Sequence, residues 1–168
     1  TGMGSSTDYY FPKAYRRKVE LMLIGITGYA RSGKDSIASV LTDEYDFKRV
    51  AFADPMRNAL VALDPLIRIG EMIPMNLTQA LRSFTWEELK EVSPDVRGLM
   101  QRMGTEVGRN MFGQNVWIDL AMKEVAKYED VVVPDVRFTN EADAIVAAGG
   151  IMLRVTRPLV EPVNKHIS

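Results

Sequence analysis

The residues best suited to chemistry lie in one short segment, GYARSGK, at positions 28–34. The segment fits the pattern G-x-x-x-x-G-K, after an apolar run at 21–27 and before a stretch of helical periodicity at 34–44. Glycine lets the backbone curl, so that successive N–H groups and the next helix N-terminus converge on phosphate oxygens. We therefore predict a phosphate-binding loop in which Lys34 reaches the β- and γ-phosphates of a nucleotide. The alternative is a glycine-rich turn with an ordinary surface lysine.

Asp35 occupies the position at which Ser or Thr usually offers a hydroxyl group to Mg²⁺. Ser36 follows, but it is not a simple replacement, because one helical step turns its side chain by about 100°. Two interpretations stay open for Asp35. It binds the metal directly or through water, or it is a helix-start carboxylate stabilised by the helix dipole.

Asp135 is a second acidic candidate, at the end of the apolar segment 131–134. Such a segment is typical of a buried parallel strand, and open parallel sheets present ligand-binding residues where their strands end. Asp135 is therefore similar to the strand-end acid that acts on Mg²⁺ in phosphate-loop enzymes. The alternative is a cap for the next helix, whose first turn Asn140 and Glu141 are also placed to close.

Strands and helices must alternate to position these groups. The expected strands are 21–27, 49–53, 131–133 and 151–156, and the expected helices are 34–44, 54–63, 94–110, 116–128 and 138–148. This alternation implies an α/β protein with a mainly parallel sheet and helices on both faces, in three layers.

One domain is expected over 21–168, after a leader at 1–20 that is flexible or a cloning remnant. Residues 64–97 show only short helical pieces, and we assign 64–110 to a lid-like helical region that binds substrate.

Composition excludes several classes of protein. The chain has 168 residues, 46% of them hydrophobic, and 21 Lys and Arg balance 22 Asp and Glu. This balance argues against a duplex-binding protein or a polybasic membrane binder, so any anion site must be local. The absence of Cys excludes disulfides, thiolate catalysis and Cys-type zinc sites, and the single His argues against a His-rich metal centre. The apolar runs are shorter than a membrane span. We expect a soluble, cytoplasmic protein without nucleic acid or membrane partners.

Four segments together resemble the phage-type deoxynucleoside monophosphate kinases: GYARSGKDS, FADPMR, LMQRMGTEVGRNMFGQNVW and VVVPDVRFTNEA. The resemblance covers 21–157. It implies a P-loop kinase fold, Mg²⁺, and transfer of the γ-phosphoryl group of ATP to a deoxynucleoside monophosphate for DNA precursor synthesis. It also suggests a homodimer and, for a phage-encoded protein, the host cytoplasm.

The resemblance places ATP on the loop and the acceptor nucleotide on the segment around 104–117. The expected ATP-binding residues are Gly28, Arg31, Ser32, Gly33, Lys34, Asp35 and Ser36, with Asp35, Ser36 and Asp135 as metal ligands. Gly104, Thr105, Arg109 and Trp117 are expected to bind the acceptor. We expect Lys34, Arg31, Asp35 and Asp135 to be catalytic. Trp117 either stacks on the base or belongs to the core.

This chemistry agrees with the residue types in the chain. The acceptor is a phosphate oxygen that is already ionised at neutral pH, so the reaction needs positive charge rather than a general base. Arginine suits this task because its planar guanidinium pairs bidentately with phosphate. We therefore add Arg102 and Arg137 to the expected acceptor site, while Arg57, Arg154 and Arg157 remain closer to ordinary surface residues.

Several residues keep two interpretations. Glu106 follows Arg102 by four positions and precedes Arg109 by three, so it orients both guanidinium groups or belongs to an exposed salt-bridge ladder. Asp54 borders the acceptor or caps a helix. Phe112 is expected in the core, and His166 on the surface.

Two other functions stay open. One is another P-loop small-molecule kinase, similar to phosphomevalonate or dephospho-coenzyme A kinases. The other is a non-catalytic nucleotide-binding switch, although the sequence lacks the N-K-x-D motif of guanine-specific switches.

Overall fold

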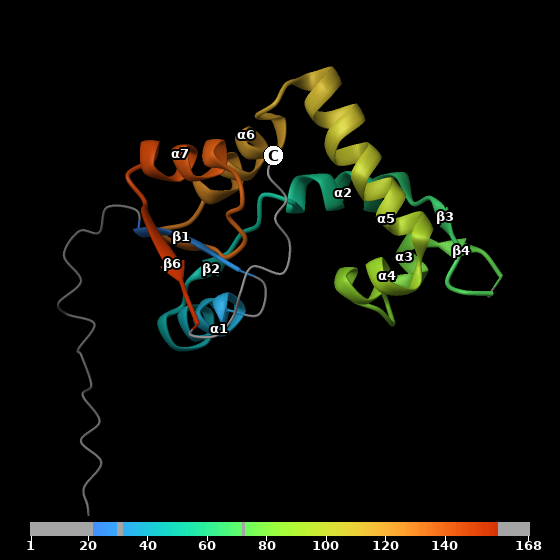
Figure 1. Cartoon of the computed structure of the whole chain (residues 1–168), viewed down its shortest axis with the longest axis horizontal. Coiled ribbons are helices and arrows are strands. Elements are labelled where there is room, and N and C mark those ends of the chain that lie inside the picture. Colours follow the sequence, from blue (N-terminus) through green and yellow to red (C-terminus); the bar gives the residue numbers. More distant parts are fainter. Residues whose placement is uncertain (1–21, 30–31, 72, 158–168) are drawn as a thin grey trace, which may run out of the picture.

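A four-stranded parallel sheet in the order β2-β5-β1-β6 forms the centre of the protein (Figure 1). The computed structural model describes residues 22–29, 32–71 and 73–157. The strands are β1 (Met22–Gly28), β2 (Lys48–Arg49), β5 (Asp130–Val133) and β6 (Ile151–Val155). The predicted second strand, 49–53, was too long, because the chain leaves the sheet after Val50, whose N–H still donates to the Val132 carbonyl oxygen at 3.1 Å. The predictions for Arg31, His166 and the leader at 1–20 lie outside the described residues.

Alternate strand residues face opposite layers, as the twofold period of a strand requires. Ile24, Ile26 and Val132 pack with Ala38 of α1 (Lys34–Tyr45) on one face. Leu23, Val131 and Val133 belong to a second cluster on the other face, beneath α6 (Val116–Val125) and α7 (Thr139–Ala147). The predicted three-layer arrangement with a mainly parallel sheet is confirmed.

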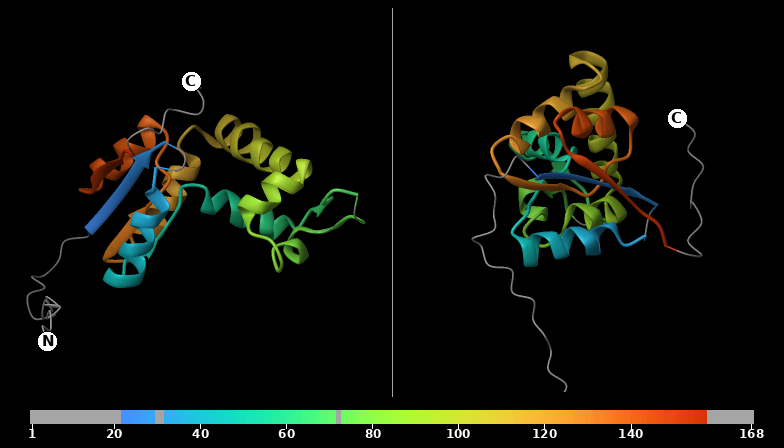
Figure 2. Two further views of the ribbon diagram at one scale, coloured as in Figure 1. Left: turned by 60° about the horizontal axis from the view of Figure 1, so that its bottom comes forward. Right: turned by 90° about the vertical axis from the view of Figure 1, so that its left-hand side faces the viewer.

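Helix α2 (Asp54–Leu63) leads from the sheet to a second, helical part of the molecule (Figure 2). This part contains β3 (Leu66–Ile67), β4 (Met75–Asn76), α3 (Leu77–Ala80), α4 (Trp86–Val92) and α5 (Pro94–Gln101). Its elements share their own cluster of buried side chains, among them Leu60, Ile67 and Leu89. The short helical pieces expected in 64–97 are therefore present, and they stand beside the sheet rather than over it (Figures 1 and 2).

The helix predicted over 94–110 changes its conformation part-way. After α5 it continues as a π-helix, η2 (Arg102–Phe112), in which the hydrogen bonds span five residues. Such helices are rare and occur frequently at functional sites. The two helices form one long rod that leads from the helical part toward α6, beside the sheet (Figure 1). Within the described segments, no helix is both long and apolar enough to cross a membrane.

Candidate active site

The side chain of Lys34 turns back toward the end of β1. Gly33 has φ 102°, a left-handed conformation that favours glycine, and it stands directly before α1. The Lys34 Nζ donates hydrogen bonds to the carbonyl oxygens of Gly28 and Tyr29, at 2.8 and 2.7 Å. Ser32 is buried, and its Oγ has no hydrogen-bond partner among the described residues. The loop thus has the strand–loop–helix setting that the phosphate-binding motif predicted.

Asp35 and Ser36 lie on the exposed first turn of α1. The side chain of Asp35 is 83% exposed, and its Oδ1 pairs with Nη2 of Arg49 at 3.0 Å. This partner was not expected from the sequence. The pair leaves both interpretations of Asp35 open, because a solvent-exposed carboxylate can exchange one cation for another at little cost.

The carboxyl ends of β1, β2 and β5 meet at one edge of the sheet, because these strands are parallel. A cavity of about 610 Å³ lies at this edge. Its lining includes Lys34 and Asp35 after β1, Asp54 after β2 and Asp135 after β5, together with Arg49, Arg57 and Arg137. Asp54 and Asp135 therefore face the same space as the loop lysine.

Asp135 is the most unusual group in this cavity. Its Oδ1 is buried and has no hydrogen-bond partner among the described residues. Burial raises the pKa of Asp135 above its ordinary value, against the opposing charges of Arg137 and Arg57, and nearby Asp54 adds to the increase. The alternative role as a helix cap is wrong, because none of the hydrogen bonds found among the described residues involves its side chain, and α7 begins with a different carboxylate.

Glu141 is that carboxylate, and it is buried. Its Oε2 accepts hydrogen bonds from the backbone N–H groups of Arg137 and Phe138, at 2.8 and 3.1 Å. The prediction that Glu141 closes the start of the helix is confirmed. The same prediction was wrong for Asn140, whose amide donates to Oδ1 of Asn115 at 2.9 Å instead. Burial raises the pKa of Glu141, and the two backbone hydrogen bonds partly oppose this increase.

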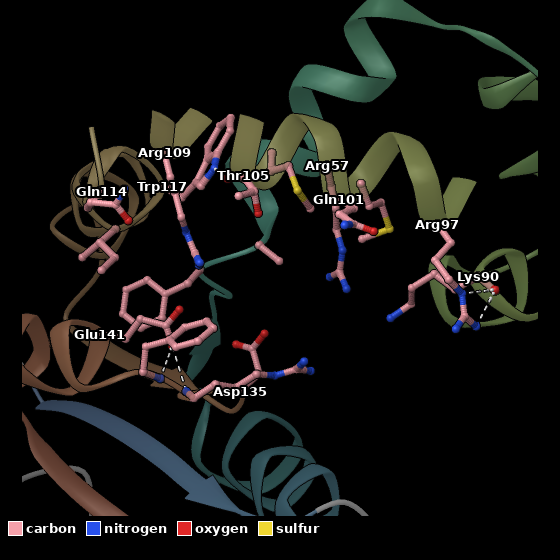
Figure 3. A pocket seen from close by; sticks show the side chains of 18 residues that line it. Arg57, Lys90, Arg97, Gln101, Thr105, Arg109, Gln114, Trp117, Asp135 and Glu141 are labelled. Atoms are coloured by element: carbon pink, nitrogen blue, oxygen red, sulfur yellow. Dashed lines mark hydrogen bonds between the residues drawn. The ribbon is translucent and has the colours of Figure 1, made fainter. Parts of the chain in front are cut away.

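A second cavity, of about 330 Å³, lies between the sheet edge and the helical part, where η2 forms one wall (Figure 3). It falls in the size range of small-molecule sites. It shares Arg57, Asp135 and Arg137 with the first cavity, so the two spaces join at these three side chains.

The second cavity is strongly cationic although the chain as a whole is nearly neutral. Five cationic and two acidic side chains line it: Arg57, Lys90, Arg97, Arg109 and Arg137, and Asp135 and Glu141. The apolar lining includes Phe52, Met56, Met100, Trp117 and Phe138. The charge suits an anionic ligand, and the apolar surface suits a flat, aromatic part of the same ligand.

Trp117 holds the wall of this cavity in place. Its Nε1 donates a hydrogen bond to the Gly104 carbonyl oxygen at 2.9 Å, and its ring lies against Gly108 of η2. A Cβ at position 108 would overlap the indole. Trp117 therefore packs and also lines the cavity, and the two alternatives considered for it are not exclusive.

Arg109 reaches across the cavity from η2 toward the start of α7 (Figure 3). Its guanidinium carbon lies 4.7 Å from the centre of the Phe138 ring, a cation–π contact. Because Glu141 holds the backbone of Phe138, it indirectly supports Arg109 from the opposite wall.

The structure brings most of the expected acceptor residues together. Gly104, Thr105, Arg109, Trp117 and Arg137 all line the second cavity. Arg102 does not appear in its lining and is exposed. Glu106 is exposed as well and takes part in none of the ion pairs found among the described residues, so neither a guanidinium clamp nor a salt-bridge ladder forms in this part of the chain.

Sequence reasoning missed several lining residues: Arg57, Lys90, Arg97, Gln101 and Gln114. Lys90 lies in α4 and Arg97 in α5, on either side of the extended Ser93, so no single helical period connects them in the sequence. Arg57 offered a better signal, because it follows the end of a strand by only a few residues.

A family model described as deoxynucleotide monophosphate kinase matches residues 70–168. The putative deoxynucleotide monophosphate kinase of Acanthamoeba polyphaga mimivirus is 31% identical over 169 residues, covering 88% of this chain and 80% of the viral protein. The chain belongs to the deoxynucleotide monophosphate kinase family. This membership confirms the resemblance stated from the sequence and favours it over the two alternative functions.

Two further relatives match a shorter stretch. The deoxynucleotide monophosphate kinases of Enterobacteria phage T4 and Escherichia phage RB69 are 36% and 32% identical over 78 residues. Each alignment covers 44% of this chain and 32% of the phage protein.

Proposed function

We propose that this protein transfers the γ-phosphoryl group of ATP to a deoxynucleoside monophosphate and releases the deoxynucleoside diphosphate. The observation that carries the proposal is the junction of the two cavities at Arg57, Asp135 and Arg137. One cavity contains Lys34 of the phosphate loop, and the other contains the residues expected to hold the acceptor. A donor in the first and an acceptor in the second would meet at this cationic junction.

On the acceptor side, the base lies against Trp117 and the apolar lining, and the phosphate points toward the junction. Thr105, Gln101 and Gln114 supply hydrogen-bonding groups along the wall (Figure 3). Arg109 and Arg137 supply guanidinium groups that pair with phosphate oxygens. Gly104 contributes backbone to the wall of the acceptor site, and the hydrogen bond from Trp117 Nε1 to its carbonyl oxygen holds this backbone in place.

On the donor side, ATP lies on the loop, with Gly28, Arg31, Ser32, Gly33 and Ser36 around its phosphates. Lys34 exchanges the carbonyl oxygens of Gly28 and Tyr29 for the β- and γ-phosphates when the nucleotide binds. The ammonium group already lies beside the backbone of Gly28 and Tyr29, so the exchange replaces only these two hydrogen bonds.

The acidic residues fit a bound Mg²⁺ ion. No group of three acidic or histidine side chains suited to a metal occurs in the parts of the chain described. Magnesium, however, is commonly held by one or two carboxylates, with waters and substrate phosphates completing its shell. Oδ1 of Asp135, which has no hydrogen-bond partner in the described part of the chain, supplies one such oxygen in the cavity that contains Lys34. Asp35 with Ser36 is the second place for a ligand. Mg²⁺ would neutralise charge on the transferring phosphates.

The residues act mainly by position and charge. The attacking phosphate oxygen carries no proton at neutral pH, so the site needs no general base. Lys34, Arg31 and the arginines at the junction lower the repulsion between two polyanions and hold them in line. Lys34, Arg57 and Arg137 lie at the start of a helix, on a packed helix and just after a strand, which supports a fixed arrangement of positive charge.

One experiment tests the proposal. The protein is incubated with ATP, Mg²⁺ and each of the four deoxynucleoside monophosphates or their ribose counterparts, and the products are separated by chromatography. Formation of deoxynucleoside diphosphates supports the proposal, and hydrolysis of ATP alone or no product contradicts it. The same panel measures the preference for deoxyribose, and sedimentation of the active protein tests the homodimer. We place the reaction in the cytoplasm, which is the host cytoplasm if a phage encodes the protein.

A further inference from the structure

Glu87 of α4 connects two cationic side chains of the proposed acceptor site. Its Oε1 pairs with Nη2 of Arg57 at 3.3 Å, and its Oε2 pairs with the ammonium group of Lys90. Arg57 belongs to α2 and Lys90 to α4, so a single carboxylate joins the two helices. Both cations line the cavity expected to hold the acceptor, and Glu87 lines the adjoining one.

The two cations are sheltered, whereas the carboxylate is not. The side chains of Arg57 and Lys90 are 22% and 25% exposed, and that of Glu87 is 71% exposed. Arg57 also has a buried Nε without a partner among the described residues. Arg57 also pairs with Oδ1 of Asp54 at 3.4 Å. Packing and this second pair keep the cations in position, while Glu87 can turn into solvent at little cost.

A phosphate group, like the Glu87 carboxylate, offers anionic oxygens to these two cations, and it carries more negative charge than a carboxylate. Its oxygens accept from a guanidinium and an ammonium at once, as the two oxygens of Glu87 do. Glu87 and a phosphate therefore compete for Arg57 and Lys90.

We propose that Glu87 is an internal substitute for the acceptor phosphate, which occupies Arg57 and Lys90 in the empty enzyme and leaves them when the nucleotide binds. This inference rests on the proposed function. It adds Arg57 and Lys90 to the residues that bind the acceptor phosphate, and it makes Glu87 a residue that weakens this binding. The carboxylate keeps two close cations neutralised and joins α4 to α2 until substrate replaces it.

The test compares the binding of a deoxynucleoside monophosphate and of its unphosphorylated deoxynucleoside by calorimetry, without ATP. Glu87→Gln should tighten binding of the monophosphate by about 2- to 10-fold, the range expected for removing exposed ion pairs. Affinity for the deoxynucleoside should not change, because it carries no phosphate. Glu87→Asp keeps the charge on a shorter side chain that cannot join both cations, and it should give an intermediate gain.

Glu124→Gln is the matched control. Glu124 pairs with Lys127 three positions later, as Glu87 does with Lys90, but neither residue lines the acceptor cavity. This variant should leave both affinities unchanged.

The outcomes separate the inference from the proposed function. If wild-type protein forms diphosphates but Glu87→Gln binds the monophosphate equally well or more weakly, Glu87 is not a competitor, and weaker binding would mean that it orients Arg57. An equal gain for nucleoside and nucleotide also overturns the inference. If wild-type protein binds no deoxynucleoside monophosphate and makes no diphosphate, the proposed function fails and the inference fails with it.

Discussion

Replacing Gly108 by alanine tests whether the Trp117 contact shapes the acceptor wall. A methyl group at position 108 would stand inside 3.0 Å of three indole atoms, a separation that packed side chains do not reach. The indole is rigid and is fixed by its hydrogen bond to the Gly104 carbonyl oxygen. Either η2 must move away from α6, or Trp117 must leave its place.

The size of the effect follows from two opposing contributions. Overpacking costs about 1–3 kcal/mol. Exchange of glycine for alanine in a helix gains about 0.5–1 kcal/mol from backbone entropy and propensity. Gly98 lies in α5 on the same helical rod, and a Cβ there would meet nothing within 4 Å. Gly98→Ala therefore measures only the gain in stability from replacing glycine by alanine in a helix. The difference in stability between Gly108→Ala and Gly98→Ala then gives the cost of overpacking.

Thermal unfolding and steady-state kinetics together provide the assay. With about 2–4 °C per kcal/mol for a protein of this size, Gly108→Ala should melt about 2–12 °C below Gly98→Ala. It should also raise KM for the acceptor while KM for ATP stays unchanged, because only the acceptor wall moves. If Gly108→Ala melts as high as Gly98→Ala and keeps its acceptor KM, the indole does not hold this wall.

The remaining predictions concern the charged groups. Lys34→Ala should lower kcat by orders of magnitude while the melting temperature changes little, because its hydrogen-bond partners are loop carbonyls that water can serve; near-wild-type turnover would refute the phosphate-loop assignment. Arg109→Lys keeps the charge but loses the planar fork, so acceptor KM should rise more than ATP KM, and equal losses would remove Arg109 from the acceptor site. Glu141→Ala loses two hydrogen bonds at the start of α7 and should destabilise the protein by about 1–3 kcal/mol in chemical denaturation, whereas Glu141→Gln keeps an acceptor. The folded-state pKa of Glu141 is raised, so its ionisation disfavours folding above that pKa; wild-type stability relative to Glu141→Gln should therefore increase as pH falls through the raised pKa, and a constant difference would contradict the burial argument.

Local sequence was enough to predict the alternation of strands and helices and the phosphate loop. Apolar periodicity reports which way a side chain faces within its own element, and a glycine-rich turn before a lysine needs no distant residue to take its shape. The boundaries were less certain. The second strand pairs with β5 only at Lys48 and Arg49 and ends earlier than predicted, and the helix at 94–110 continues as a π-helix where Trp117 of another element packs against Gly108.

Tertiary structure alone decided which cations face the site. Arg102 and Arg109 have the same chemistry on the same helix, yet only Arg109 lines the cavity. Lys90 and Arg97 come from the region that the sequence assigned to substrate binding without singling out either residue, and packing among α2, α4 and α5 turns them inward. Asp135 was expected at a strand end, but the burial of its Oδ1, and the lack of a hydrogen-bond partner for it among the described residues, depend on the elements that surround it. The sequence determines the residue types and the spacing of apolar residues along each helix or strand. Which sides of two elements face each other depends on the burial of residues far apart in the chain, and no single stretch of sequence encodes it.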